Sequence, residues 1–139
     1  MMPTRRAALA VFAMVAVAFA LPALAADNAP QPFTEAAFDA AQKAGKPILI
    51  DTFATWCDIC ARQKPIIDKL LSEAEFKNLV TFRVDFDTQK DVMRKFNARL
   101  QSTLIAFRGD KEVARSVGET QPEWIEDVMS KATEKSPAS

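Results

Sequence analysis

Along the chain, the spacing of apolar residues alternates between the pattern of a buried strand and the pattern of an amphipathic helix. Residues 48–53 carry apolar side chains on both faces, which is typical of a central strand in a covered sheet. The helix expected over 61–71 has one apolar face, formed by Ile66, Ile67, Leu70 and Leu71. Pro65 removes a backbone hydrogen bond inside this helix and should bend it.

The remaining segments carry their own start and stop signals. Thr34 is expected to cap a helix that runs to Lys43 and stops at Gly45, and Thr88 to cap a helix that runs to Phe96. Residues 79–86 have the composition of another strand.

The C-terminal part of the chain predicts a hairpin and a last helix. Residues 103–107 and 112–117 flank the turn residues 108–111, a pattern typical of an antiparallel pair. Residues 120–123 resemble a capping box, with Thr120 as the cap of a helix whose apolar face includes Trp124 and Ile125.

This order of elements predicts an α/β fold with a central mixed sheet of four to five strands and helices on both faces. Right-handed crossovers would place the strand of residues 48–53 in the middle of the sheet.

A chain of 139 residues favours one folded domain. Residues 1–25 are expected to be a signal peptide, because Arg5 and Arg6 precede an apolar run that ends in an A-x-A type cleavage site. The same arginines leave the choice between the general and the twin-arginine export route open. We expect a linker at 26–32, the domain at 33–132 and a flexible tail at 133–139.

Charge and composition exclude several classes of function. The net charge is zero, and removal of Arg5 and Arg6 leaves 16 basic residues against 18 acidic ones, about −2, so no nucleic-acid partner is expected. The chain contains no histidine. This excludes Cys-His and Ser-His-Asp catalysis and histidine-based metal sites.

The chain has two cysteines, Cys57 and Cys60, in a C-x-x-C spacing where the central strand meets a helix. Free N–H groups and the helix dipole stabilise an anion there, so the pKa of the Cys57 thiol should be lowered, and Cys60, one turn on, should be more buried. Cys57 would then attack a disulfide and Cys60 would resolve the mixed disulfide. A structural staple is a weaker explanation, because so short a loop gains only about 2 kcal/mol against nearly 5 for a loop of about 100 residues.

A zinc site is disfavoured because two thiols are too few ligands, whereas two-coordinate Cu(I) stays open. We expect no cofactor and no resident metal.

The chain resembles the thioredoxin family from Phe33 to about Ala132. The residues that carry this resemblance lie in register across the segments; they are Asp51, Ala54, Trp56, Cys57, Cys60, Pro65, Asp85, Thr103, Phe107 and Gly118. The resemblance implies a thioredoxin-like fold, and it assigns Cys57 as the attacking thiol and Cys60 as the resolving one.

The resemblance also implies roles for residues around the cysteines. Asp51 matches a buried acid that assists proton transfer at the resolving cysteine; burial should raise its pKa, and Arg83 is a candidate partner. Trp56 is expected at the rim of the site, in contact with substrate. The loop of Gln101, Ser102 and Thr103 stands opposite the cysteines and should bind the substrate peptide through backbone groups of Gln101.

Two departures from the family pattern bear on activity. Asp58-Ile59 replaces the common Gly-Pro between the cysteines, and a carboxylate beside Cys57 should disfavour its thiolate and make the couple more reducing. Ser102 stands where the family has a cis-proline. Because a cis bond before a non-proline residue costs about 3 to 4 kcal/mol, we expect a trans peptide there.

These features predict an exported, monomeric thiol-disulfide oxidoreductase that reduces client proteins in the periplasm. Such a protein needs electrons from a membrane donor, because exported compartments lack a reducing pool. Two alternatives stay open: a disulfide-forming oxidant, and a non-catalytic binding module for Cu(I) or for apo-proteins.

Overall fold

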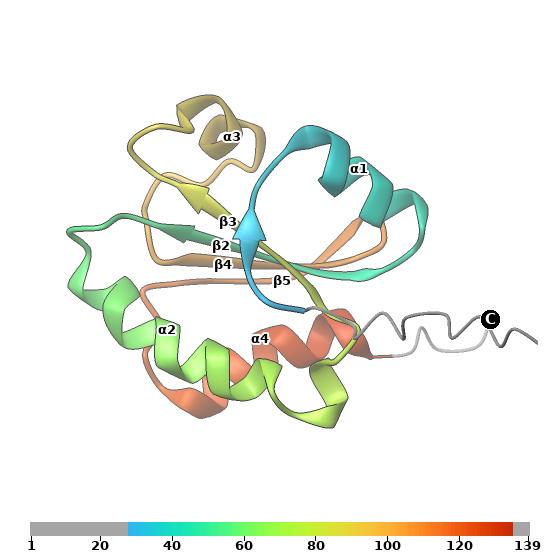
Figure 1. The fold of residues 1–139 in the computed structure, drawn as a ribbon. Coiled ribbons are helices and arrows are strands. Elements are labelled where there is room, and N and C mark those ends of the chain that lie inside the picture. Colours follow the sequence, from blue (N-terminus) through green and yellow to red (C-terminus); the bar gives the residue numbers. More distant parts are fainter. Residues whose placement is uncertain (1–27, 135–139) are drawn as a thin grey trace, which may run out of the picture.

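The computed structural model describes residues 28–134 as helices packed on both faces of a five-stranded sheet (Figure 1). The elements follow one another as β1 (Gln31–Pro32), α1 (Glu35–Lys43), β2 (Pro47–Phe53), α2 (Asp58–Leu71), the 3-10 turn η1 (Ala74–Phe76), β3 (Val80–Asp85), α3 (Lys90–Lys95), β4 (Thr103–Arg108), β5 (Lys111–Val117) and α4 (Pro122–Thr133). The signal peptide expected at residues 1–25 lies outside the described residues.

The sheet has the order β1-β3-β2-β4-β5, so β2 lies at its centre, as predicted. The strands β1, β3 and β2 are parallel, and β4 pairs antiparallel with both β2 and β5. The predicted α/β fold with a mixed sheet is therefore confirmed. It also brings the C-terminal end of β2, where the cysteines follow, beside the N-terminal end of β4, because Asp51 is paired with Leu104.

Local signals explain where several elements begin and end. Thr34 caps α1 by accepting a hydrogen bond from the Ala37 N–H at 3.2 Å, as predicted. Gly45 follows the helix with a φ of 66°, a left-handed conformation that glycine adopts without steric cost. Helix α2 begins at Asp58, earlier than the predicted start at Ala61, because Cys57 itself serves as its N-cap.

Two predicted caps are wrong: neither α3 nor α4 has a side-chain cap hydrogen bond, and a preceding carboxylate accepts the N–H of each predicted threonine. The Thr88 N–H donates to Asp85 Oδ1 in the turn after β3, and α3 starts later, with Gln89 as N-cap. The carboxylate of Glu119 accepts the N–H groups of Thr120 and Gln121, each at 2.9 Å, before α4 begins at Pro122.

The stretch expected to be a linker contains the edge strand β1. Gln31 pairs with Phe82 and Pro32 with Arg83 of β3, and the Phe33 N–H donates to the Arg83 carbonyl at 2.9 Å. A strand of two residues, one of them proline, has too little alternation to be recognised from sequence.

Two hydrophobic clusters cover the two faces of the sheet. Helices α1 and α3 close the first, which is rich in phenylalanine. Helices α2 and α4 close the second, which is largely aliphatic; its members include Leu49, Ile67, Leu70, Ile125 and Met129. Pro65 lies inside α2, and the bend expected there stays a prediction.

None of the helices within residues 28–134 is long and apolar enough to cross a membrane.

Candidate active site

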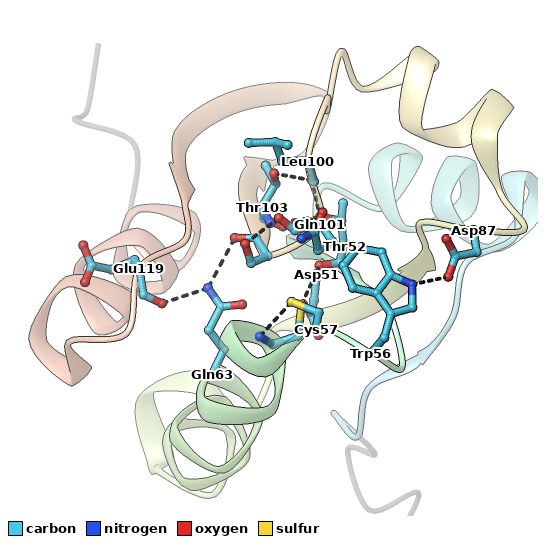
Figure 2. Close-up of a disulfide and its surroundings, with 12 residues drawn as sticks. Asp51, Thr52, Trp56, Cys57, Gln63, Asp87, Leu100, Gln101, Thr103 and Glu119 are labelled. Carbon is cyan, nitrogen blue, oxygen red and sulfur yellow. Dashed lines mark hydrogen bonds between the residues drawn. A yellow bond between two sulfur atoms is a disulfide. The ribbon is translucent and has the colours of Figure 1, made fainter.

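A disulfide joins Cys57 and Cys60 at the start of α2, with their Cα atoms 5.3 Å apart (Figure 2). The strand β2 ends at Phe53, and a short turn then leads into the helix. Both cysteines pack on Ala54, with Phe53, Ile59 and Phe86 around them. The two sulfurs are therefore close enough to cycle between a dithiol and a disulfide.

Cys57 occupies the N-cap of α2, and the Cys60 N–H donates to Cys57 Sγ at 3.1 Å. An N–H group and a helix N-terminus both favour negative charge, so this position would stabilise a thiolate on Cys57 once the disulfide is reduced. The expected difference in burial between the cysteines is wrong for this oxidised form. Each is 6% exposed, and both belong to the same packed cluster with Ala54.

Asp51 is buried in β2, only 6% exposed, and pairs with Arg83 of β3. The Arg83 Nε–H donates to Asp51 Oδ2 at 3.1 Å, and the guanidinium lies over the Phe53 ring at 3.7 Å. Loss of water on burial raises the pKa of Asp51 above its ordinary 3.8, and the positive charge of Arg83 opposes this increase without cancelling it. The buried acid predicted from sequence and its pairing with Arg83 are both present.

A small cavity of about 130 Å³ lies against Asp51 on the α2 side of the sheet. Its lining includes Arg83 and three residues of α2, Lys64, Ile67 and Asp68. Lys64 and Asp68 are surface residues that form an ion pair with each other. A cavity of this size has room for water, which gives a buried carboxyl group a route for exchanging its proton.

The loop before β4 holds Ser102 at a φ of 61°, and no cis peptide bond occurs in residues 28–134. The expected trans peptide before Ser102 is thus confirmed. The Ser102 N–H donates to the Thr52 carbonyl at 2.7 Å, a bond that proline could not make. Cys60 Sγ lies 4.0 Å from the same carbonyl oxygen, so Thr52 connects the loop to the disulfide.

Thr52 was not predicted as a site residue, although it is fully buried at the end of β2. Its hydroxyl oxygen accepts the Thr103 N–H at 2.9 Å and lies 3.1 Å from the carbonyl oxygen of Leu100. The Thr103 hydroxyl also donates to the Leu100 carbonyl, at 2.7 Å. The loop opposite the cysteines is therefore fastened to the central strand at both of its ends.

Gln101 lies in the middle of this loop and is half-buried. Its carbonyl accepts a hydrogen bond from the Ser102 hydroxyl at 2.5 Å. Among the described residues, its backbone N–H has no hydrogen-bond partner. A backbone donor beside a disulfide is able to bind an extended peptide.

Gln63 is a second site residue that was not predicted from the sequence. It lies on the buried face of α2, in an apolar stripe with Cys60, Ile67 and Leu70. Its Nε2 donates to the carbonyls of Ser102, at 3.3 Å, and Glu119, at 2.8 Å (Figure 2). A polar side chain within an apolar helical stripe is the sequence signal that could have identified it.

Trp56 lies at the rim of the site and is 58% exposed. Its Nε1–H donates to Asp87 Oδ2 at 2.8 Å, and its ring meets Phe86 edge to face with centroids 6.1 Å apart. The indole N–H is thus held by Asp87, while more than half of the residue stays exposed to solvent. Asp58, the acid between the cysteines, is exposed in the first turn of α2.

Residues 28–134 contain no group of three or more His, Cys, Asp or Glu side chains placed to hold a metal ion. A C-x-x-C disulfide at a helix N-terminus, with a buried acid in the central strand, defines a thiol-disulfide oxidoreductase of the thioredoxin fold.

Comparison with known proteins gives the same class. The family model for thioredoxin matches residues 29–131. Thioredoxin-2 of Saccharomyces cerevisiae is 35% identical over 82 residues, which cover 58% of this chain and 77% of that protein. The bifunctional thioredoxin reductase/thioredoxin of Mycobacterium leprae is 35% identical over 86 residues, covering 61% of this chain but 19% of that protein.

Among solved structures, Trxlp from Edwardsiella tarda EIB202 is 40% identical, with a TM-score of 0.71. The match covers 73% of this chain and 98% of that one. The chain belongs to the thioredoxin family.

Proposed function

We propose that this protein is exported and reduces disulfides of client proteins in the periplasm, with electrons supplied by a membrane donor. The apolar run after Arg5 and Arg6, with its cleavage site, supports export. The observation that carries the catalytic part is the Cys60 N–H directed at Cys57 Sγ at the start of α2, because it favours the attacking thiolate.

Catalysis begins with the reduced protein. The Cys57 thiolate attacks one sulfur of a client disulfide, and a mixed disulfide forms between Cys57 and the client. The client S–S bond breaks, and its other sulfur leaves as a thiolate that takes up a proton from solvent. Cys60, as a thiolate, then attacks Cys57 Sγ and releases the second client sulfur as a thiolate that takes up a proton. Two electrons pass to the client, and the Cys57–Cys60 disulfide remains.

Asp51 takes the proton from Cys60 as that thiol becomes nucleophilic. Its raised pKa suits this task, because a carboxyl group that binds a proton more readily is a better general base. The cavity lined by Lys64 and Asp68 gives the proton a route to solvent.

The client docks across the rim of the disulfide. The exposed side chain of Trp56 covers apolar client side chains, and the free N–H of Gln101 binds a client carbonyl. Thr103 contributes by holding this loop in place through its bonds to Thr52 and Leu100.

Reduction of insulin by the purified mature chain, with dithiothreitol as electron source, tests the reaction. We expect turnover by the unaltered protein and none by Cys57→Ser. Cys60→Ser should instead accumulate a mixed disulfide with its client, which mass spectrometry would identify from a periplasmic extract. Absence of both turnover and trapped clients would refute the proposal and favour a binding module.

Equilibration with glutathione decides the direction of electron flow. A potential near the −270 mV of reducing members supports a reductase, whereas one near −120 mV would assign the protein to disulfide formation. Fractionation of cells that express the chain with or without residues 1–25 tests export. Both forms remaining in the cytoplasm would refute it.

A further inference from the structure

Gln63 has an environment that an apolar residue would fit better. The side chain is only 1% exposed and lies among the aliphatic residues of α2 that pack on the sheet. Its Oε1 is buried and has no hydrogen-bond partner among residues 28–134. A buried acceptor without a partner lowers stability. An amide at this position is therefore explained only by the hydrogen bonds that its Nε2 donates.

The donor side ties together two loops that flank the disulfide. Nε2 donates to the carbonyl of Ser102, before β4, and to that of Glu119, between β5 and α4. The Gly118 N–H donates to the same Ser102 carbonyl at 2.9 Å. Figure 2 shows Gln63 reaching from α2 towards both segments. One side chain thus fixes the spacing between the helix that carries the cysteines and both loops.

Ser102 needs such support, because its φ of 61° is left-handed and costs free energy for a residue with a Cβ. Thr52 holds the N–H groups of Ser102 and Thr103 from one side. Gln63 and Gly118 hold the Ser102 carbonyl from the other. Held from both sides, the loop keeps the unpartnered N–H of Gln101 at a constant place beside the disulfide.

We propose that Gln63 is a positioning residue for client recognition, which keeps the loop of residues 101–103 in its docking conformation. This inference rests on the proposed function, since it assigns a role within client docking. Gln63 takes no part in thiol exchange itself. Its loss should therefore weaken binding of a peptide client and leave the reactivity of the disulfide unchanged.

The test compares a protein substrate with a small one. Gln63→Met keeps the length of the side chain and removes its donor. We expect KM for insulin to rise about tenfold with kcat unchanged. A displaced loop would lose the hydrogen bond between the Gln101 N–H and the client, and one uncharged hydrogen bond contributes about this much to binding. The rate of reaction with the small disulfide 5,5′-dithiobis(2-nitrobenzoate) and the glutathione equilibrium should not change.

Two further variants allow the test to be made even if Gln63→Met folds poorly. Thr52→Val removes the hydroxyl that accepts the Thr103 N–H and should also raise KM for insulin. Gln42→Met is the matched control: Gln42 donates to the Gly109 carbonyl at 3.4 Å from α1, on the other face of the sheet, and its loss should leave KM unchanged. Far-UV circular dichroism checks that all three are folded.

Amide hydrogen exchange measures the loop directly. The N–H groups of Ser102 and Thr103 should exchange faster in Gln63→Met than in the unaltered protein or in Gln42→Met. Equal exchange rates, an unchanged KM, or a parallel loss of activity on insulin and the small disulfide would each overturn the inference. If the unaltered protein reduces neither substrate, the proposed function fails, and the exchange rates still decide whether Gln63 holds the loop.

Discussion

The two faces of the sheet are built from different kinds of residue. The α1/α3 face is a cluster of phenylalanine rings. The ring centroid of Phe38 lies 5.2 Å to 6.1 Å from the ring centroids of Phe33, Phe82, Phe96 and Phe107. The α2/α4 face is largely aliphatic, but at its disulfide end it also buries Asp51 and Gln63. Among the described residues Asp51 is the one buried ionisable side chain.

The α1/α3 face therefore contributes mainly to stability, whereas the α2/α4 face carries the groups that take part in the chemistry. The phenylalanine rings on one face contribute packing free energy and carry no polar atom that needs a hydrogen-bond partner. The other face accepts a buried carboxyl group with a raised pKa and an amide with an unmet acceptor, both beside the disulfide. Substitutions on the two faces should therefore change different properties of the protein.

The largest effect is expected from Phe38→Ala, which leaves a cavity at the centre of the ring cluster. We expect a loss of about 3 to 5 kcal/mol in the free energy of unfolding, measured in urea, and no change in the glutathione equilibrium. Trp124→Ala, at an exposed position of α4, is the control and should cost less than about 0.5 kcal/mol. A shifted redox equilibrium in Phe38→Ala would contradict the separation of the two faces.

Asp51→Asn should slow turnover by up to about 100-fold. This is the lower end of the range that general acid–base catalysis contributes. The same substitution should raise stability at neutral pH. Because the pKa of Asp51 is raised in the folded protein, the unfolded chain loses this proton first as pH rises, and each further step in pH disfavours folding.

The stability advantage of Asp51→Asn should therefore appear above pH 3.8, the ordinary value for this group, grow through the raised pKa and then level off. Urea unfolding of both proteins across this pH range provides the measurement. Arg83 is partly exposed and can turn to solvent when its partner is neutral. A stability difference that does not vary with pH would count against a buried acid with a raised pKa.

Ser102→Gly should raise the free energy of unfolding by about 1 kcal/mol, since glycine adopts a φ of 61° without strain. Asn97, with a φ of 49°, offers a matched comparison, and Asn97→Gly should gain less because asparagine tolerates this region. Ser102→Pro should be destabilising, as it removes the N–H that donates to Thr52. A stable Ser102→Pro protein would show that the loop has another conformation of similar free energy.

The smallest effect is expected from Asp58→Asn. Removing an exposed carboxylate beside Cys57 should make the couple more oxidising by about 10 mV, or roughly 0.5 kcal/mol. The difference should shrink in high salt, which screens exposed charges. Glu75→Gln, on the turn after α2, serves as control, and an unchanged or lower potential in Asp58→Asn would refute the expectation.

Periodicity and the C-x-x-C spacing were sufficient to predict the mixed sheet, the central position of β2 and the pair of cysteines. Caps were harder to predict, because several polar residues compete for each helix start. Thr34 has no acidic neighbour before it and caps α1. In the other two turns, the carboxylates of Asp85 and Glu119 accept the backbone N–H groups of Thr88 and Thr120, which were the predicted caps.

Around the disulfide, residues whose chemical type is unusual for their place could be predicted from the sequence, such as Asp51 in a covered strand. Gln63 was not predicted, although an amide in the apolar stripe of α2 is a signal of the same kind, and Thr52 was not predicted because a buried threonine is ordinary in a strand. The roles of both residues depend on contacts between segments far apart in the chain. The Gln63–Glu119 and Thr52–Thr103 bonds form only after α2, β2 and β4 have come together. Such partners cannot be inferred from local pattern alone.

The short strand β1 has a further consequence for the behaviour of the protein at high concentration. It covers the outer side of β3 at Phe82 and Arg83, and Pro32 carries no N–H for a neighbouring chain to bind. The opposite border, β5, carries Lys111, Glu112 and Arg115, and its register is shifted at Ala106/Phe107. Charge, proline and irregular pairing thus protect both borders of the sheet against strand addition, the usual first step of β-aggregation.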